Sequence, residues 1–314
     1  LIDAVRSADQ TGEPVLLVAG GSNLVVADVG FDGTVVLIRT SGISEEVDDC
    51  SGALVTVAAG ENWDDFVAYA ISRDWAQVEA LSGIPGAVGS TSIQNVGAYG
   101  QQVSDTIASV RTWDRQENRV TTLMAADLNF GYRSSLFKTQ PDRYVVLTVQ
   151  FQFPLAAGLS APVQYAELAR TLGIAEGERA DAKAVRQVVL GLRSAKGMVL
   201  DPNDHDTWSA GSFFTNPIIS EAAAEALGES APKFAQSDGT VKTSAAWLIE
   251  HSGFTKGYQR GGVGLSTKHT LALTNRGTGT ASELIDLARE VRGEVEKQFS
   301  VRLVNEPVFV GLEL

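Results

Sequence analysis

The chain of 314 residues contains few of the residues on which metal sites and disulfides depend. It has one cysteine, Cys50, and three histidines, His205, His251 and His269. A single cysteine excludes an internal disulfide and is typical of a reducing compartment. No CxxC pair, HExxH helix or other zinc-like spacing occurs. These absences argue against a metalloenzyme.

Basic residues are also scarce, with 25 Lys and Arg against 38 Asp and Glu and a formal net charge of −13. Broad nucleic-acid binding requires a basic surface, so this charge argues against it. A local basic pocket for a small anion remains compatible with an acidic chain. No stretch resembles a signal peptide or a membrane span, and we expect a cytoplasmic protein that does not bind membranes. The chain begins at Leu1 rather than at methionine, which indicates that a preceding segment is missing.

Three nucleotide and nucleophile motifs are absent. There is no GxSxG nucleophile elbow and no GxxxxGK[ST] phosphate loop. The nearest approach to GxGxxG, residues 277–282, lacks the third glycine and follows no clear strand. The sequence therefore disfavours hydrolases and a Rossmann dinucleotide site.

Length and periodicity indicate two domains that mix strands and helices. Residues 143–153 alternate in the manner of a half-buried strand, with Val145, Leu147, Val149, Phe151 and Phe153 expected on one face. Other strands are expected near residues 14–20, 33–38, 53–60 and 307–312. Helices are expected after the N-cap Asn62 and near residues 181–196, 244–250 and 280–299. Pro154 and the Ala-Ala-Gly that follows end the long strand, so we predict domains over 1–155 and 156–314.

The most unusual stretch is "GIPGAVGSTSIQNVGAYG", residues 83–100, which has five glycines and no charge. Polar residues interrupt every apolar run, which excludes a spanning helix, and its regularly placed apolar residues argue against a flexible linker. Glycine allows backbone to approach a ligand closely. The stretch is therefore interpreted as a neutral wall for a planar heterocycle.

A second glycine segment, "GGSNLVV", follows the first expected strand directly, at residues 20–26. Successive backbone N–H groups and a hydroxyl can hold a pyrophosphate without any positive charge. The alternative for this short pattern is a tight β-turn.

Five motifs then stand in order: "AGGSNLVV", "LSGIPGAVGSTSIQNVGAYG", "FGYRSSLFK", "SAGSFFTNP" and "LVNEPVFVG". In these motifs the chain resembles the UDP-N-acetylenolpyruvoylglucosamine reductases of peptidoglycan precursor synthesis, from about residue 14 to residue 311. The resemblance implies an α+β fold, with a two-lobed FAD-binding domain of the vanillyl-alcohol-oxidase type and a C-terminal α+β substrate-binding domain. It also implies that an N-terminal strand is missing and that the last segment carries Glu306 back to the active site.

By this resemblance the cofactor is FAD, with NADPH as co-substrate and a potassium ion near the substrate phosphates. The FAD would be bound non-covalently, because no histidine precedes residue 205 and Cys50 lies in a turn-like context. The residues expected to bind FAD are Gly20, Gly21, Ser22, Asn23, Leu24, Ile84, Pro85, Gly86, Ala87, Val88, Gly89, Ser90, Gln94, Asn95, Gly97, Ala98 and Tyr99.

The resemblance assigns catalysis to Arg133, Ser212 and Glu306. Arg133 would bind and polarise the substrate carboxylate, because a guanidinium can spread the charge that develops beside it. Ser212 would donate the proton, and Glu306 would assist with the carboxylate and enolate. Taken alone, Arg133 could equally form a surface ion pair and Ser212 could be a turn serine.

Substrate contacts are expected from Tyr165, as a lid, and from Lys196, Asn216 and His269, with Asn275 less firmly matched. The simpler alternatives are a helix-end lysine for Lys196 and a satisfied strand histidine for His269. The stretch between Lys196 and Ser212 departs from the family pattern. We expect a monomer acting on NADPH and UDP-N-acetylglucosamine enolpyruvate.

Two other functions remain open at this level. One is a different flavin oxidoreductase of the same fold, which the catalytic trio argues against. The other is a nucleotide-binding module without catalysis, which would be colourless when purified.

Overall fold

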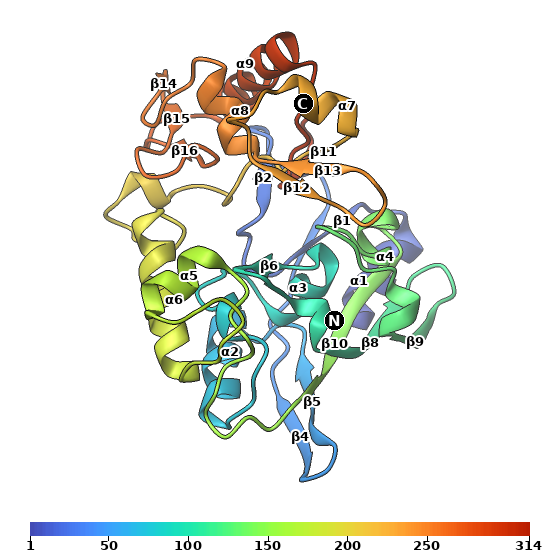
Figure 1. Ribbon diagram of the computed structural model, residues 1–314. Coiled ribbons are helices and arrows are strands. Elements are labelled where there is room, and N and C mark those ends of the chain that lie inside the picture. Colours follow the sequence, from blue (N-terminus) through green and yellow to red (C-terminus); the bar gives the residue numbers. More distant parts are fainter. The chain divides into compact units, whose positions relative to one another are not determined.

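The structure, a computed structural model, describes all 314 residues, and they form two compact units (Figure 1). Unit 1 comprises Leu1–Gly21 and Asp32–Ser194, and unit 2 comprises Ser22–Phe31 and Ala195–Leu314. Each unit has its own hydrophobic core, and each is described by itself below.

Unit 1 mixes short helices with a central antiparallel sheet. Its strands are β1 (Val15–Val18), β3 (Thr34–Leu37), β4 (Ile43–Asp48), β5 (Gly52–Ala58), β6 (Gly97–Ala98), β7 (Gln101–Gln102), β8 (Ile107–Asp114), β9 (Arg119–Met124) and β10 (Tyr144–Phe153). Its helices are α1 (Ile2–Thr11), α2 (Trp63–Ser72), α3 (Val88–Gln94), α4 (Leu136–Thr139), α5 (Ala166–Leu172) and α6 (Ala182–Ala195), the last of which ends at the unit boundary.

The sheet of unit 1 has five strands in the order β4-β5-β10-β8-β9, all antiparallel to their neighbours. A separate parallel pair joins β1 to β3. The strand predicted from the alternation of residues 143–153 is present as β10, which lies at the centre of the sheet. The N-cap Asn62 is also confirmed, because its side chain accepts the backbone N–H of Asp65 at the start of α2.

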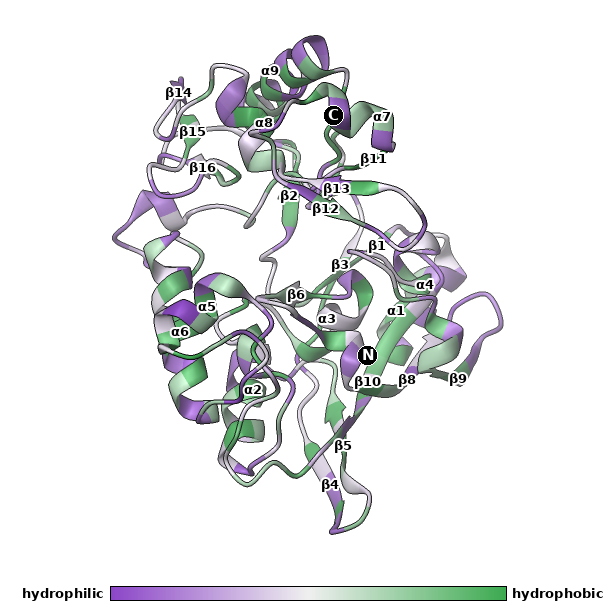
Figure 2. Ribbon diagram, viewed as in Figure 1, coloured by the Kyte–Doolittle hydropathy of each residue, from purple (hydrophilic) through white to green (hydrophobic).

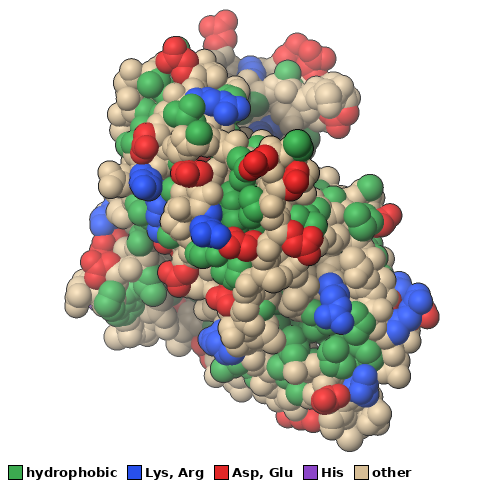
Figure 3. Space-filling view, turned by 90° about the horizontal axis from the view of Figure 1, so that it is seen from below, with side chains coloured by type: hydrophobic (Ala, Val, Ile, Leu, Met, Phe, Trp, Pro, Cys, Tyr) green, Lys and Arg blue, Asp and Glu red, His purple; other side chains and the backbone are tan.

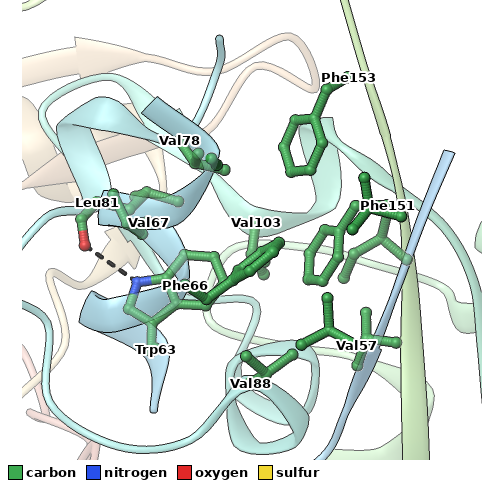
Figure 4. Packing of buried hydrophobic residues seen from close by; sticks show 14 of the residues in the cluster. Val57, Trp63, Phe66, Val67, Val78, Leu81, Val88, Val103, Phe151 and Phe153 are labelled. Atoms are coloured by element: carbon green, nitrogen blue, oxygen red, sulfur yellow. Dashed lines mark hydrogen bonds between the residues drawn. The ribbon is translucent and has the colours of Figure 1, made fainter. Parts of the chain in front are cut away.

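The core of unit 1 is packed between α2, α3 and the sheet. Trp63 and Phe66 of α2 face Phe151 and Phe153 of β10, with Val88 of α3 beside them (Figure 4). The indole N–H of Trp63 donates to the carbonyl of Leu81 at 3.0 Å, so this buried polar group is satisfied. Val88, the first residue of α3, therefore belongs to the main core of unit 1.

The expectation that the odd-numbered residues of β10 share one face is correct only in part. Val149, Phe151 and Phe153 lie in the main core, but Val145 and Leu147 pack on the opposite side, with Val5 of α1 and Trp113. The register against β8 shifts between Val146 and Thr148. A bulge inserts one residue and exchanges the two faces, which the alternation of the sequence does not reveal.

The two units also divide the chain elsewhere than at the predicted 155/156 boundary. Helices α5 and α6 remain in unit 1, because Leu168, Val185 and Val189 pack with Ala80 and Tyr99. Figure 2 shows hydrophobic and hydrophilic residues mixed along α6, as expected of a helix with one buried side. The chain passes into unit 2 only at Ala195.

Unit 2 is built from short sheets and three helices. Its strands are β2 (Leu24–Val26), β11 (Ile218–Ile219), β12 (Lys233–Ala235), β13 (Val241–Thr243), β14 (Gln259–Arg260), β15 (Val263–Leu265), β16 (Leu273–Asn275) and β17 (Val308–Val310). Its helices are α7 (Glu221–Ala226), α8 (Ala245–His251) and α9 (Ala281–Phe299). The helix α9, expected near residues 280–299, begins with a capping box between Thr280 and Glu283 and buries Ile285, Leu287, Ala288, Val291 and Val295.

The segment Ser22–Phe31 leaves unit 1 and is fastened into unit 2 at two points. Its strand β2 pairs in parallel with β17, near the other end of the chain. Asp28 accepts the backbone N–H groups of Ala281 and Ser282 at the start of α9, at 2.7 and 3.0 Å. The second half of the GGSNLVV motif therefore belongs to a different compact unit from its two glycines.

Acidic and basic side chains are interspersed on the molecular face drawn in Figure 3. No helix of the chain is both long enough and apolar enough to cross a membrane.

Candidate active site

Within unit 1 the two glycine segments meet. A Cβ added to Gly20 would lie 3.0 Å from the Cα of Gly86, so a side chain at position 20 would require the neighbouring backbone to move. Gly86 itself has a φ of +117°, which side-chain-bearing residues rarely adopt. The structure therefore places Gly20 of the first glycine segment against Gly86 of the neutral stretch, while Ser22, Asn23 and Leu24 lie in unit 2.

The neutral stretch is more ordered than a glycine-rich wall suggests, because its middle forms α3. Val88 is fully buried, and a Cβ on Gly89 would lie 2.6 Å from that of Ala59. Backbone N–H groups of Val88 and Gly89 donate to Glu61 and Ala59, both at 2.9 Å. Val88 and Gly89 therefore pack α3 against the sheet.

Gln94, at the end of α3, has a buried side-chain nitrogen without a hydrogen-bond partner in the chain. A buried, unsatisfied donor costs about 1–3 kcal/mol, so such groups usually have a functional or ligand-related explanation. A flavin carries acceptor atoms that could satisfy it. Together with the close Gly20–Gly86 approach, this donor makes the residues of unit 1 a chemically suitable FAD site.

Two other expected FAD contacts have side chains that are already engaged within the chain. The Asn95 amide donates to the carbonyl of Gly131 at 2.9 Å and accepts the N–H of Ser104 at 3.2 Å. The Ser90 hydroxyl donates to the carbonyl of Ala87 at 2.7 Å. Asn95 thus ties the end of α3 to the turn that carries Arg133.

Arg133 occupies a tight turn in which Gly131 and Ser134 exchange two backbone hydrogen bonds. Its guanidinium donates through Nη2 to the carbonyl of Gly97 at 2.7 Å and through Nη1 to that of Asn95 at 3.4 Å. A Cβ at position 97 would lie 3.0 Å from the carbonyl oxygen of Gln101 and 3.1 Å from Nη1 of Arg133, so a side chain there would require these neighbours to shift. Carbonyls of the neutral stretch therefore fix the plane of the guanidinium.

Backbone strain is concentrated around this arginine. Arg133 and Tyr99 have φ values of +52° and +48°, in the left-handed region that bulky residues avoid. Such conformations cost of order 1 kcal/mol or more and gather at functional sites. The ring of Tyr99 meets that of Tyr165 edge-on, with centroids 5.3 Å apart, and Tyr165 is 42% exposed. The expected lid tyrosine is therefore at the surface of unit 1 beside the strained segment.

Within unit 2 the structure brings Ser212 and Glu306 together through Phe213. The N–H of Phe213 donates to Leu271 at 2.7 Å, and its carbonyl accepts the N–H of Glu306 at 2.8 Å. The next residue, Phe214, forms a bridge with Asn305. Ser212 is half-buried, and its hydroxyl forms no hydrogen bond within the chain. The side chain of Asn23 also reaches this point and donates to the carbonyl of Glu306 at 3.4 Å.

The expected substrate residues of unit 2 separate into two groups. Lys196 and His269 are near each other, since the Lys196 charge acts on the imidazole. The pKa of His269 is lowered to about 4, chiefly by burial, with smaller contributions from Lys196 and Lys256 and opposition from Glu250. Asn216 instead holds the start of α8, because its carbonyl oxygen accepts the N–H of Ala245 at 3.0 Å. The side-chain carbonyl of Asn275 accepts from Gly277 and Gly279, which makes it a turn residue.

Sequence reasoning missed two cations, one near Tyr99 and Arg133 in unit 1 and the other near His269 in unit 2. Burial lowers the pKa of Arg193 on α6, whereas Tyr99 and Asp64 raise it, and Arg133 acts with burial. Lys256 faces His269 in unit 2. For Arg193 a signal existed, because the residue lies on the apolar side of a clearly periodic helix. No such sequence signal marked Lys256.

Comparisons with known proteins agree with this geometry. Residues 201–310 match the family model described as the C-terminal domain of UDP-N-acetylenolpyruvoylglucosamine reductase, and residues 1–123 match an FAD binding domain. A UDP-N-acetylenolpyruvoylglucosamine reductase of Cutibacterium acnes is 57% identical over 99% of this chain and 82% of its own length. That of Streptomyces avermitilis is 55% identical over 100% of this chain and 88% of its own.

A crystal structure of the enzyme of the same name from Thermus caldophilus superimposes with a TM-score of 0.64. It covers 99% of this chain and 90% of that one at 21% identity, which supports the fold. The chain is thus an FAD-dependent oxidoreductase of α+β fold, with an FAD-binding domain and a C-terminal α+β domain. It belongs to the UDP-N-acetylenolpyruvoylglucosamine reductase family.

Proposed function

We propose that this chain reduces UDP-N-acetylglucosamine enolpyruvate to UDP-N-acetylmuramate with NADPH as the reductant. The observation that carries the proposal is the junction of unit 2, where Phe213 links the turn of Ser212 to Glu306. Membership of the family supports the same substrate and favours an enzyme over a nucleotide-binding module. When bound, FAD supplies the two-electron chemistry, accepting hydride from NADPH and passing it to the terminal enolpyruvyl carbon.

In this proposal Arg133 binds the substrate carboxylate. Hydride addition leaves carbanion character on the carbon beside that group, and a planar guanidinium stabilises the charge as it spreads onto the oxygens. The carbonyls of Gly97 and Asn95 hold the guanidinium in one orientation before substrate binds. Little reorganisation is then needed during the reaction.

Ser212 is proposed as the proton donor to the carbon that carries negative charge. An aliphatic hydroxyl is a weak acid, but a carbanion-like centre is a strong base, so the transfer is chemically reasonable. The hydroxyl is available, because it forms no hydrogen bond within the chain. Glu306, on the other side of Phe213, would assist the carboxylate and enolate as the proton moves.

The remaining parts of the proposal concern binding. Tyr165 would cover the substrate diphosphate, with Lys196 and His269 contacting the diphosphate and uridine side. The residues of Gly20–Leu24 and Ile84–Tyr99 would hold FAD without a covalent bond. A potassium ion near the phosphates rests on the family resemblance, and replacement of potassium by sodium in the assay tests it.

Separate measurement of the two half-reactions of a Ser212→Ala variant tests the proposed function. Reduction of the flavin by NADPH needs no protein acid, so we expect it to proceed at near-normal speed. Reoxidation by the enolpyruvyl substrate should slow by about 10²–10⁴-fold, the usual cost of removing a positioned proton donor. Ser212→Cys should recover part of this loss, because a thiol can also supply a proton.

The matched control is Ser220→Ala, which removes the N-cap hydroxyl of α7 elsewhere in unit 2. We expect both of its half-reactions to be normal. If Ser212→Ala slowed both half-reactions equally, Ser212 would be a structural turn residue. If wild-type flavin were not reoxidised by the enolpyruvyl substrate at all, another flavin oxidoreductase activity would have to be sought.

A further inference from the structure

Residues 197–210, between Lys196 and Ser212, fold into a compact loop. The Thr207 hydroxyl donates to the carbonyls of Asp201 and Asp204 at 2.9 and 2.8 Å, and the Trp208 indole donates to Asp201 at 3.2 Å. A 3-10 turn, His205–Thr207, closes the loop. The loop is thus internally bonded and ordered.

One buried side chain of this loop, that of Asp206, binds residues of two other segments of unit 2. The Asp206 carboxylate accepts the backbone N–H of Thr267 at 2.9 Å, the Thr267 hydroxyl, and Nη1 of Arg276 at 2.9 Å. Only 9% of the Asp206 side chain and 16% of the Arg276 side chain are exposed. Nη2 of Arg276 also donates to the carbonyl of Leu265 at 2.9 Å. Asp206 therefore ties the loop to the residues that follow β15 and β16.

The chain after Asp206 runs along β16 until it reaches Ser212. The carbonyl of Trp208 accepts the N–H of Asn275 at 3.0 Å, and Ser209 forms a bridge with Thr274. The hydroxyl of Ser209 then accepts the N–H of Gly211 at 3.2 Å, in the turn that presents Ser212. The position of Ser212 along β16 is therefore determined by how the segment from Asp206 to Gly211 packs against β16.

We propose that Asp206 and Arg276 are positioning residues for Ser212, an inference that rests on the proposed role of Ser212 as proton donor. Their buried ion pair, reinforced by Thr267, anchors the entry of the segment, and the Phe213–Leu271 hydrogen bond anchors its exit. With both of these interactions formed, the turn at Gly211 is held in one position. Loss of the first anchor leaves the exit intact and lets the serine hydroxyl move relative to its acceptor.

The charge state of the carboxylate is consistent with this role. Burial raises the pKa of Asp206, but the hydrogen bonds from Thr267 and Arg276 outweigh burial, and the net pKa lies below its usual value. The pair is therefore ionised at neutral pH, where an arginine and a carboxylate make their strongest hydrogen bonds.

Asp206→Asn and Arg276→Lys test the proposal in the full-length flavoprotein. Asp206→Asn keeps the size of the side chain and removes its charge. We expect substrate-driven flavin reoxidation to slow by roughly 10- to 100-fold, since displacements near 1 Å can cost 100-fold in rate. Flavin reduction by NADPH and the dissociation constant of the substrate should stay within about twofold. Arg276→Lys should lose less than Arg276→Gln, because lysine retains the charge.

A double variant separates positioning of Ser212 from general disturbance. In a Ser212→Ala background, Asp206→Asn should slow the residual reoxidation no further, because the group that it positions is absent. The control is Asp201→Asn, an exposed carboxylate of the same loop, for which wild-type rates are expected. Should Asp206→Asn fail to fold, the milder Arg276→Lys carries the same prediction.

The outcomes distinguish this inference from the proposed function. If Ser212→Ala slows reoxidation and neither Asp206→Asn nor Arg276→Gln does, the positioning role is overturned and the function stands. Equal slowing by Asp206→Asn with and without Ser212 overturns it as well. If Ser212→Ala leaves reoxidation at its normal rate, the proton-donor role itself fails.

Discussion

His269 provides a prediction whose size follows directly from its surroundings. The imidazole is largely buried beside Lys196 and Lys256, and its pKa falls from 6.5 to about 4. The unfolded chain therefore takes up a proton near pH 6.5, whereas the folded chain stays neutral at this position until about pH 4. Because the unfolded state binds more protons across this window, stability falls as the pH is lowered through it.

The magnitude follows from about 1.4 kcal/mol per pH unit. Protonating His269 in the folded chain costs about 3 kcal/mol relative to the unfolded chain. Between pH 7 and pH 5, the titration of His269 should lower the free energy of unfolding by about 2 kcal/mol. His269→Gln removes the titrating group, and the variant should lose about that much less stability over the same interval. The matched control, His251→Gln, removes an exposed histidine stacked on Trp247.

Two assays check this prediction. Urea unfolding at pH 7 and pH 5, compared between wild type, His269→Gln and His251→Gln, gives the differences in the free energy of unfolding. NMR of the histidine ring protons gives the midpoint directly, since the chain has three histidines and His269→Gln identifies one signal. A His269 signal that titrates near pH 6.5 would refute the reasoning, as would equal losses of stability in both variants.

Four further predictions concern the cofactor and the substrate. FAD should be released by acid precipitation and remain in the supernatant, whereas flavin that pellets with the protein would indicate a covalent bond. Arg133→Lys should slow flavin reoxidation while reduction by NADPH stays near normal, because the point charge of lysine does not replace the planar, two-pronged guanidinium. Arg111→Lys, at an exposed position, is the control. Wild-type turnover of the Arg133→Lys variant would show that Arg133 is structural. Gly97→Ala should reproduce the Arg133→Lys defect, because its Cβ would crowd Nη1, and a normal reoxidation rate would show that the guanidinium has another stable position. Tyr165→Phe and Tyr165→Ala should raise the apparent substrate constant, Ala more than Phe, and unchanged substrate constants would leave Tyr165 only its packing on Tyr99.

Much of the secondary structure could be predicted because its signals are local. The capping box and apolar stripe of α9 lie within one segment of chain, and so does the cap of α2 by Asn62. By contrast, α3 was not expected, because a run rich in glycine and serine is a poor helix former in isolation. Close packing of Gly89 against Ala59 makes the helix stable in this position.

For the candidate site, the sequence motifs named the residues that are expected to form it, because each motif is a short continuous stretch of chain. The structure places Gly20 against Gly86, and it joins the backbone of Phe213, next to Ser212, to that of Glu306. The engagement of Asn95 by Gly131 could not be foreseen, because a side-chain amide in a sequence does not reveal its partner. Neither could the buried contacts of Asp206 with Thr267 and Arg276.

The sequence by itself determined the residues available to this protein: glycine-rich motifs of a flavin-binding domain, an arginine, a serine and a glutamate in motifs of the family, and very few cysteines and histidines. Tertiary structure alone decided how these groups are held. It joined Ser22–Phe31 to unit 2, exchanged the faces of β10 at a bulge, and bonded Asp206 to Arg276 across 70 residues. The physical reason is that caps and periodic stripes are satisfied by neighbours in the chain. Strand register, bulges and buried ion pairs are satisfied by distant residues, and only packing selects which ones.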